Sequence, residues 1–432
     1  MRGATVSFAA LLACVSVAGA ETVAITGGTV HTMTNAGVIE GGTVVIQDDK
    51  ITAVGRGVAI PEGARVIDAT GKVVTPGLMA PHTTFGIEEI SLEEKSLDYG
   101  LDDEHFGAAF SVAEAINPRS TLIREARIRG ITRAIVAPTD SAGPFTEEPE
   151  GPIAGQGAVI HLGSTDDFVV RNPNGLYFVY GEGGAEVSGG ARGGALLRLR
   201  EALDDAVDYS ENRTAWEEGN RRSFYLHRLD LEALQQLVSG KIPLVVKVQR
   251  ASDIETMIQL ASDYDLKLVI VGGREAWLVA DKLAAAGVAA VINPLENTPA
   301  SFESMASSLK NAAILHEAGV KIAFTIDTVS DPHNQPNIKQ AAGNAVAHGL
   351  PWEAALRAIT VNPAEIFGIE HGQLAVWQEA DLVVWDGDPL EVTTYADHVF
   401  IRGREIPMVS RSTLLFERYK DLDFEYPPAY RN

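Results

Sequence analysis

The sequence predicts an α/β protein built on a TIM-like (β/α)8 barrel, with a small composite β-sandwich formed by its N- and C-terminal segments. Eight apolar, β-rich runs alternate with helix-patterned segments over residues 76–369. Such alternation is typical of parallel strands buried on both faces. Short strand patterns separated by turns occupy both ends of the chain. The length of 432 residues fits a barrel of roughly 250–300 residues with a smaller module beside it.

Residues 1–20 have the pattern of a secretory signal peptide. Arg2 precedes an apolar run over residues 6–17, and Ala18-Gly19-Ala20 supplies the small residues of a cleavage site. The run is shorter than the ~20 residues that span a bilayer. We therefore expect an exported protein, periplasmic or secreted, with no transmembrane span. Cys14 is the only cysteine and follows Leu11-Leu12-Ala13, so a lipid-anchored lipoprotein is the alternative.

The composition excludes several classes of partner and site. The chain carries 58 acidic and 35 basic residues, a formal charge of −23. This balance argues against nucleic acid or an anionic membrane as a partner, and a solvated acidic surface is its simplest meaning. Cleavage after Ala20 would leave a mature chain without cysteine. Disulfides and zinc sites built on thiolates would then be absent.

The terminal segments, residues 21–75 and 370–432, are interpreted as the sandwich. Gly27-Gly28, Gly41-Gly42 and Asp48-Asp49 provide turns between short β-patterned runs. A similar pattern returns after residue 380. The expected strands lie at residues 22–25, 43–47, 51–54, 65–68 and 398–401, and within the block of residues 380–389.

The central residues 76–369 are interpreted as the barrel. In a parallel barrel the carboxyl ends of the strands surround the reaction site. The expected strands lie at residues 78–82, 131–137, 158–162, 176–180, 243–248, 267–271, 289–292 and 321–327. Helices are expected at 275–286 and 304–318, and Ser252 with Glu255 forms a capping-box pattern for a third helix. Residues 139–194 are rich in Gly and Pro and are expected to form long loops over the barrel mouth.

The chain lacks several common catalytic and nucleotide-binding motifs, which argues against the reactions that depend on them. The chain has no G-x-S-x-G nucleophile elbow and no P-loop. Gly155-Gln156-Gly157 lacks the third glycine of a dinucleotide-binding fingerprint. His316-Glu317 begins like a zincin helix, but Val320 stands where the second histidine belongs.

Three further stretches belong with residues 73–86 around His82. They are Gln249-Arg250-Ala251-Ser252-Asp253-Ile254-Glu255, Asn362-Pro363-Ala364-Glu365-Ile366 and the block Ala380-Asp381-Leu382-Val383-Val384-Trp385-Asp386-Gly387-Asp388-Pro389. Together these stretches resemble the amidohydrolase superfamily. The chain is most similar to the exported, imidazolonepropionase-related branch. The resemblance implies a metal-dependent hydrolase that cleaves carbon–nitrogen bonds in a small amide, dipeptide-like or cyclic substrate.

The resemblance also implies a set of metal ligands, most of which are replaced in this chain. The family typically uses a His-x-His pair on strand 1, often a Lys on strand 4, one His on each of strands 5 and 6, and an Asp on strand 8. Such metals lower the pKa of a bound water to roughly 7. His82 and Asp327 match the first His and the Asp. The remaining family positions hold Thr84, Tyr177, Lys247 and Gly272, and Trp277 stands where a further His is common. Thr84, Tyr177, Gly272 and Trp277 are expected to line the pocket.

Two ligands from separate strands would hold zinc poorly, because zinc sites use three or four protein ligands. His161, at the end of the third expected strand, is either a third ligand or a buried histidine bonded to the backbone. Two alternatives remain open: the chain binds one zinc or other divalent ion, or it binds no metal. We expect Lys247 to occupy the lost metal volume, pair with Asp327 near His82, and share catalytic work with that carboxylate.

Two functions follow from these residues. The first is an exported hydrolase with an altered metal site. The second is a non-catalytic member that binds a small amide or carboxylate, or serves as the partner subunit of an active relative. A homo-oligomer or a hetero-oligomer fits either function.

Overall fold

The computed structural model describes residues 22–101, 106–139, 151–220, 223–326 and 332–421. The predicted signal peptide, including Cys14, lies outside these residues. Across the described ranges no helix combines the length and the apolar character needed to cross a membrane.

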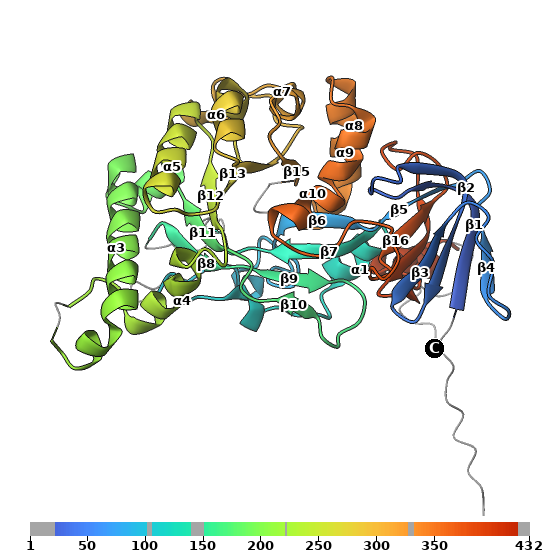
Figure 1. The fold of residues 1–432 in the computed structure, drawn as a ribbon, viewed down its shortest axis with the longest axis horizontal. Coiled ribbons are helices and arrows are strands. Elements are labelled where there is room, and N and C mark those ends of the chain that lie inside the picture. Colours follow the sequence, from blue (N-terminus) through green and yellow to red (C-terminus); the bar gives the residue numbers. More distant parts are fainter. Residues whose placement is uncertain (1–21, 102–105, 140–150, 221–222, 327–331, 422–432) are drawn as a thin grey trace, which may run out of the picture.

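Strands from both ends of the chain share one sheet, as the sequence predicts (Figure 1). Its order is β18-β17-β16-β5-β1-β2-β3, with β4 paired to β1. The antiparallel pair β5 and β16 joins the two ends, with Val74 opposite Val384. The composite sheet is thereby confirmed, while a two-layer sandwich and its boundaries stay predictions. Its strands are β1 (Thr22–His31), β2 (Val38–Gln47), β3 (Lys50–Gly55), β4 (Arg65–Asp68), β5 (Val73–Pro76), β16 (Leu382–Trp385), β17 (Ala396–Ile401) and β18 (Arg404–Glu405).

The eight expected central strands are all present, but they belong to two sheets. One has the order β10-β9-β7-β6 and the other β15-β14-β13-β12-β11-β8. Neighbours are parallel from β11 to β15 and between β6 and β7. These strands are β6 (Leu78–Thr83), β7 (Ile131–Val136), β8 (Ile153–Gln156), β9 (Ala158–His161), β10 (Val169–Arg171), β11 (Leu176–Val179), β12 (Leu244–Val248), β13 (Leu268–Gly272), β14 (Ala289–Ile292) and β15 (Ile322–Phe324).

The expectation that all eight strands are parallel is wrong for the third. Strand β9 runs antiparallel to β7, and the preceding β8 runs antiparallel to β11. Only Gly157 separates β8 from β9, so one stretch of chain crosses from the larger sheet to the smaller one. The two sheets are therefore joined by a shared segment. Over the described residues, the hydrogen-bonded strands do not form one closed barrel sheet.

The two sheets enclose a common core. Successive side chains of a strand point to opposite faces, so one face can be inner and the other outer. Tyr177, Val245 and Val269 from the larger sheet pack with Ile135 and Val159 from the smaller one. The residues that alternate with these along each strand point to the outer face, where they pack against the helices. Parallel strands buried on both faces explain why these runs are apolar throughout.

Helices α5 to α8 lie along one side of the larger sheet (Figure 1). Two expected helices are shorter than predicted, because residues 276–279 form a 3-10 turn before α6 and residues 305–310 precede α7. The expected loop region contains β8, β10 and α2, so it is more ordered than predicted. The helices are α1 (Thr121–Arg127), α2 (Glu182–Glu186), α3 (Arg192–Glu217), α4 (Arg228–Val238), α5 (Ala251–Asp263), α6 (Ala280–Ala285), α7 (Asn311–Glu317), α8 (Ile338–Ala347), α9 (Trp352–Ala358), α10 (Val361–Ile366) and α11 (Arg411–Tyr419).

The capping box predicted at Ser252 is wrong. Helix α5 begins at Ala251, and Arg250 is its N-cap without a side-chain capping bond. The amide of Ala251 instead donates to Glu275 Oε2 at 3.2 Å. Glu275 also accepts from the amide of Ala306 at 3.0 Å through Oε1. A carboxylate 24 residues further on thus satisfies one of the unpaired amides of the first turn.

Candidate functional site

A small cavity lies where strands β6, β11 and β12 approach their carboxyl ends. Its volume is about 20 Å³, roughly enough for one water molecule. His82, Tyr177 and Lys247 are its polar side chains of greatest chemical interest. The predicted neighbourhood of His82 and Lys247 is present, since both line this one cavity. The other described lining residues are Pro138, Thr139, Ala154, Phe178, Val179, Val245 and Val271.

Strand alternation and register position the two larger side chains of the cavity. Lys247 lies two residues after Val245 on β12, and Val245 belongs to the core shared by the two sheets. Lys247 is opposite Val179 on one side and Val271 on the other. Tyr177 lies on β11 and packs in the same core. The half-buried Lys247 therefore extends from an otherwise apolar inner face.

His82 is held at the opposite side of the cavity. Its carbonyl oxygen accepts from Thr325 Oγ1 at 2.9 Å, which joins the end of β6 to the residue after β15. The ring centroids of His82 and Tyr177 are 6.1 Å apart. Burial raises the pKa of the Tyr177 hydroxyl, whose oxygen accepts from Asn174 Nδ2 at 3.2 Å. A neutral phenol, an imidazole and the lysine thus line the same small cavity.

Asp327 lies outside the described residues. Its predicted pairing with Lys247, and its roles as a metal ligand and proton acceptor, stay predictions.

Three of the replaced family positions do not line this cavity among the described residues. Thr84 is buried and donates to Glu88 Oε2 at 2.8 Å. Trp277 donates from Nε1 to the carbonyl oxygen of Ala306 at 2.7 Å. At Gly272 an added Cβ would lie 2.4 Å from the side-chain nitrogen of Gln249. The amide of Gln249 therefore occupies the space of a side chain at the strand-6 ligand position.

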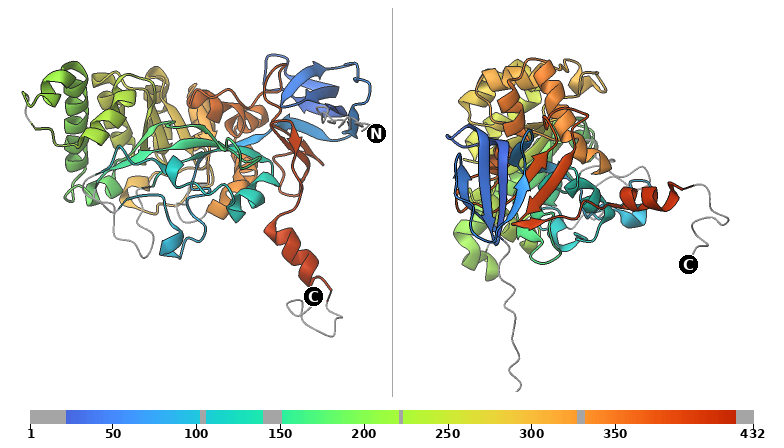
Figure 2. Two further views of the ribbon diagram at one scale, coloured as in Figure 1. Left: turned by 90° about the horizontal axis from the view of Figure 1, so that it is seen from below. Right: turned by 90° about the vertical axis from the view of Figure 1, so that its right-hand side faces the viewer.

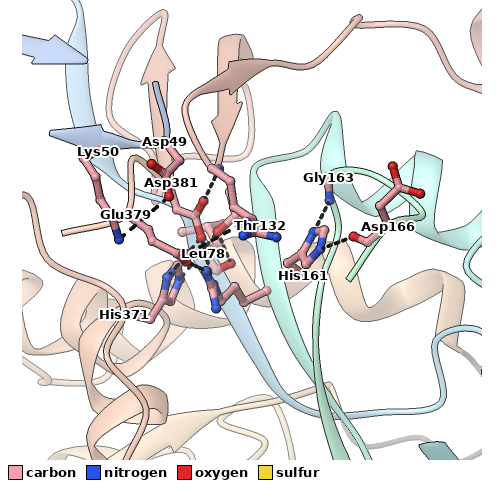
Figure 3. Close-up of polar contacts among 12 residues, drawn as sticks. Asp49, Lys50, Leu78, Thr132, His161, Gly163, Asp166, His371, Glu379 and Asp381 are labelled. Atoms are coloured by element: carbon pink, nitrogen blue, oxygen red, sulfur yellow. Dashed lines mark hydrogen bonds and ion pairs between the residues drawn. The ribbon is translucent and has the colours of Figure 1, made fainter. Parts of the chain in front are cut away.

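His161 lies at the opposite end of the sheets from His82. It is paired in register with Arg133 of β7, whereas Thr83 is paired with Val136. Its Nδ1 accepts from the amide of Gly163, and its Nε2 contacts the carbonyl oxygen of Asp166, both at 3.2 Å (Figure 3). Burial lowers the pKa of this imidazole. The alternative of a buried, backbone-bonded histidine is confirmed. Its role as a third ligand beside His82 is wrong, because β9 runs antiparallel.

A second polar cluster, which was not predicted from the sequence, joins the composite sheet to the smaller central sheet (Figure 3). Arg133 on β7 donates from Nε to Asp381 Oδ2 at 2.8 Å and also pairs with Glu379. His371 Nδ1 lies 3.3 Å from the same Asp381 oxygen. The amide of Arg402 donates to Asp381 Oδ1 at 2.6 Å. The side chains of Arg133 and Asp381 are 2% and 1% exposed.

The charges of this buried cluster are matched. Burial alone would raise the pKa of the Asp381 carboxyl, but Arg133 and His371 hold it well below its usual range. Burial lowers the pKa of His371, although its hydrogen bond to Asp381 opposes that change. Asp381 belongs to the Ala-Asp-Leu-Val-Val-Trp block, so a sequence signal for it existed. Its partners are 248 and 10 residues away, and no local pattern connects them.

Comparisons with known proteins agree with this architecture. A sequence model of the amidohydrolase family matches residues 210–409. An amidohydrolase structure from Thermotoga maritima superposes with a TM-score of 0.79 at 27% identity, covering 89% of this chain and 99% of that one. The chain is thus similar to amidohydrolases in its fold and, over residues 210–409, in its sequence.

Two curated relatives have lower identity. The amidohydrolase tasK of Hapsidospora irregularis is 21% identical over 84% of this chain, which spans only 39% of that protein. A 5-methylthioadenosine/S-adenosylhomocysteine deaminase from Halobacterium salinarum is 24% identical over 84% of both chains. An imidazolonepropionase from a Geobacillus species is 46% identical, but over only 55 residues, or 11% of this chain. That short match supports the predicted branch weakly.

The residues described here do not fit a metal site with three protein ligands. No group of three or more His, Asp, Glu or Cys side chains converges within the described part of the chain. An ammonium group stands at the strand-5 position, and Gln249 fills the strand-6 position. His161 has both ring nitrogens engaged elsewhere. A metal bound by His82 and Asp327 stays a prediction.

Proposed function

We propose that this chain is a hydrolase that cleaves a carbon–nitrogen bond in a small amide, dipeptide-like or cyclic molecule. The similarity of the chain to amidohydrolases in fold and sequence supports this reaction class. The observation that carries the site assignment is the shared cavity of His82 and Lys247. In a barrel-type layout the carboxyl ends of parallel strands hold the catalytic groups. We further propose that the protein works outside the cytoplasm, on the basis of residues 1–20.

The chemistry assigned to each side chain follows from its charge. The Lys247 ammonium binds the carbonyl oxygen or a carboxylate of the substrate and stabilises the negative charge that develops there. His82 or Asp327 takes the proton of the attacking water and returns it to the departing nitrogen. Water adds to the carbonyl carbon, the C–N bond breaks, and an acid and an amine leave. No step is assigned to a metal, because the described donors do not fit one.

A second function, binding without catalysis, is favoured by one observation. The side chain of Gln249 occupies the volume at Gly272 where the family places a metal ligand. A site closed in this way retains Lys247 as a cationic anchor for a carboxylate. Such a protein would act as a binding module or as the partner subunit of an active relative.

The test compares turnover with binding. Release of ammonia or amine is measured on N-acyl amino acids, dipeptides and cyclic ureides, with zinc added and with a chelator. We expect Lys247→Met and His82→Ala to lower kcat/KM by about 100-fold, within the range for charge-stabilising and acid–base groups. Lys267→Met, an exposed lysine that does not line this cavity, is the matched control.

The outcomes separate the two functions. Turnover that needs Lys247 and His82 supports the hydrolase. Absence of turnover, with a carboxylate raising the Tm only when Lys247 is present, supports the binding module. If neither turnover nor carboxylate binding depends on Lys247, the site assignment is wrong.

A further inference from the structure

The C-terminal arm, defined as residues 409–420, carries a helix that no other described residues of the chain bury. Helix α11 has nine residues, and none of them is buried. Leu414, Phe416 and Tyr419 are 57%, 65% and 49% exposed. Figure 2 shows the helix projecting away from the body of the molecule. Three large apolar side chains are thus presented to the surroundings on one short element.

The described contacts of the arm with the body are polar and few. The amide and hydroxyl of Ser412 both donate to Glu125 Oε1, at 2.9 and 3.0 Å. Ser410 and Thr413 form a capping box at the first turn. Helices shorter than roughly 12–15 residues are marginal in water without tertiary packing. The arm therefore needs a partner that covers its apolar side chains.

The charge of the arm indicates what that partner is. Lys420 is paired with Glu417 at 2.5 Å. Arg411 and Arg418 are exposed and have no carboxylate partner within the described residues. The arm is thus a basic, apolar element on a chain whose formal charge is −23. Its complement is an acidic surface with exposed apolar groups.

This same chain carries such a surface in its acidic segment, defined as residues 89–98. Ile90 and Leu92 are 61% and 68% exposed. Glu93 and Glu94 are exposed beside them. The segment holds Glu89, Glu93, Glu94 and Asp98 against a single Lys95. Its apolar and acidic side chains match the apolar and basic side chains of the arm.

We propose that the arm of one copy packs on the acidic segment of a second copy, and that the contact is reciprocal. A chain that carries both complementary elements is suited to a two-fold dimer, the commonest symmetric oligomer. Apolar burial supplies the affinity, and the opposite charges select the register. This inference is independent of the proposed function.

Sedimentation velocity on the full chain tests the proposal. The wild type is expected to sediment at twice the mass of one chain at micromolar concentration, and high salt should weaken the dimer. The double variant Leu414→Ser/Phe416→Ser should weaken it at least tenfold. Phe302→Ser removes an equally apolar side chain that is 85% exposed but lies outside both elements, so it should leave the dimer intact.

A charge exchange tests the pairing itself. Arg411→Glu/Arg418→Glu and Glu93→Arg/Glu94→Arg should each be monomeric alone, because both reciprocal contacts become repulsive. An equimolar mixture should form a mixed dimer, since both contacts are then complementary again. Failure of the mixture to associate overturns the assignment of the acidic segment.

Two other results overturn the whole proposal. One is a wild type that remains monomeric up to about 100 µM, well above the concentrations at which specific interfaces form. The other is a monomer that binds vesicles containing phosphatidylglycerol through Phe416, which would make a lipid surface the cover of α11.

Discussion

At the scale of single residues, close contact decides where glycine is required. Gly157 separates β8 from β9, at the point where the chain passes between the two central sheets. A Cβ added there would lie 2.5 Å from Asn174 Oδ1 and 2.6 Å from Tyr177 Cε2. Tyr177 lines the candidate cavity. The crossing of the chain and the position of Tyr177 in the cavity wall therefore both require a glycine at position 157.

Gly157→Ala should destabilise the protein by about 1–3 kcal/mol, the usual range for overpacking a well-packed core. Gly193→Ala is the matched control, because an added Cβ there meets nothing within 4 Å and alanine favours the helix. Urea unfolding at pH 7.5 measures both. Equal stability of the two variants would show that the crossing is not tightly packed.

At the scale of elements, the buried cluster around Asp381 fastens the composite sheet to β7. Arg133 comes from the smaller central sheet, and Asp381 immediately precedes β16. His371 comes from the segment between α10 and β16. Buried charges persist only when they are paired and hydrogen-bonded. The cluster thus joins β7 to the segment that leads into β16, since Arg133 and Asp381 are 248 residues apart.

Arg133→Met should destabilise the protein by about 3–5 kcal/mol, because it leaves the buried Asp381 carboxylate uncompensated. Arg65→Met removes an arginine whose pair with Glu405 is at the surface, with side chains 40% and 30% exposed. Its effect should be no more than about 1 kcal/mol. Thermal unfolding of both variants distinguishes the two pairs, and similar losses would contradict the special role of Asp381.

At the scale of the whole molecule, buried histidines make stability depend on pH. Burial lowers the pKa of His31, His161 and His371 below the ordinary value of 6.5. Below about pH 6.5 the unfolded chain therefore binds more protons than the folded chain. Asp381 affects stability at lower pH than these histidines do. Because its pKa is depressed in the folded protein, its ion pair stabilises the fold until the pH falls below the usual pKa range of a carboxyl.

The free energy of unfolding should therefore fall as the pH drops from 7.5 to 5.5, by at most about 1.4 kcal/mol per pH unit for each of these histidines. His371→Gln should make this dependence shallower, because glutamine does not titrate. Urea titrations at intervals of half a pH unit measure the slope. Stability that is flat or rises in acid would contradict the assignment of neutral histidines.

Much of the fold could be predicted because it follows from local patterns. The eight central strands, the terminal strands and their common sheet appear where apolar runs and turn residues indicate them. Strand direction could not be predicted, because an apolar run of four residues reads the same in either direction. The direction of β9 decided between the two alternatives for His161, because the antiparallel strand puts this residue at the end of the sheets opposite His82. The capping of α5 by Glu275 could likewise not be predicted, because Glu275 lies far along the chain from the first turn of α5.

The sequence by itself determined the family resemblance, the composite terminal sheet and the candidates His82 and Lys247, since these rest on motifs and on short-range periodicity. Only the tertiary structure decided that His82 and Lys247 share a cavity, that His161 lies at the opposite end, and that Gln249 fills the space at Gly272. Packing also placed Arg133, His371 and Asp381 in one buried cluster. The physical reason is that register, strand direction and steric exclusion are properties of contacts between distant segments, which a linear pattern does not encode.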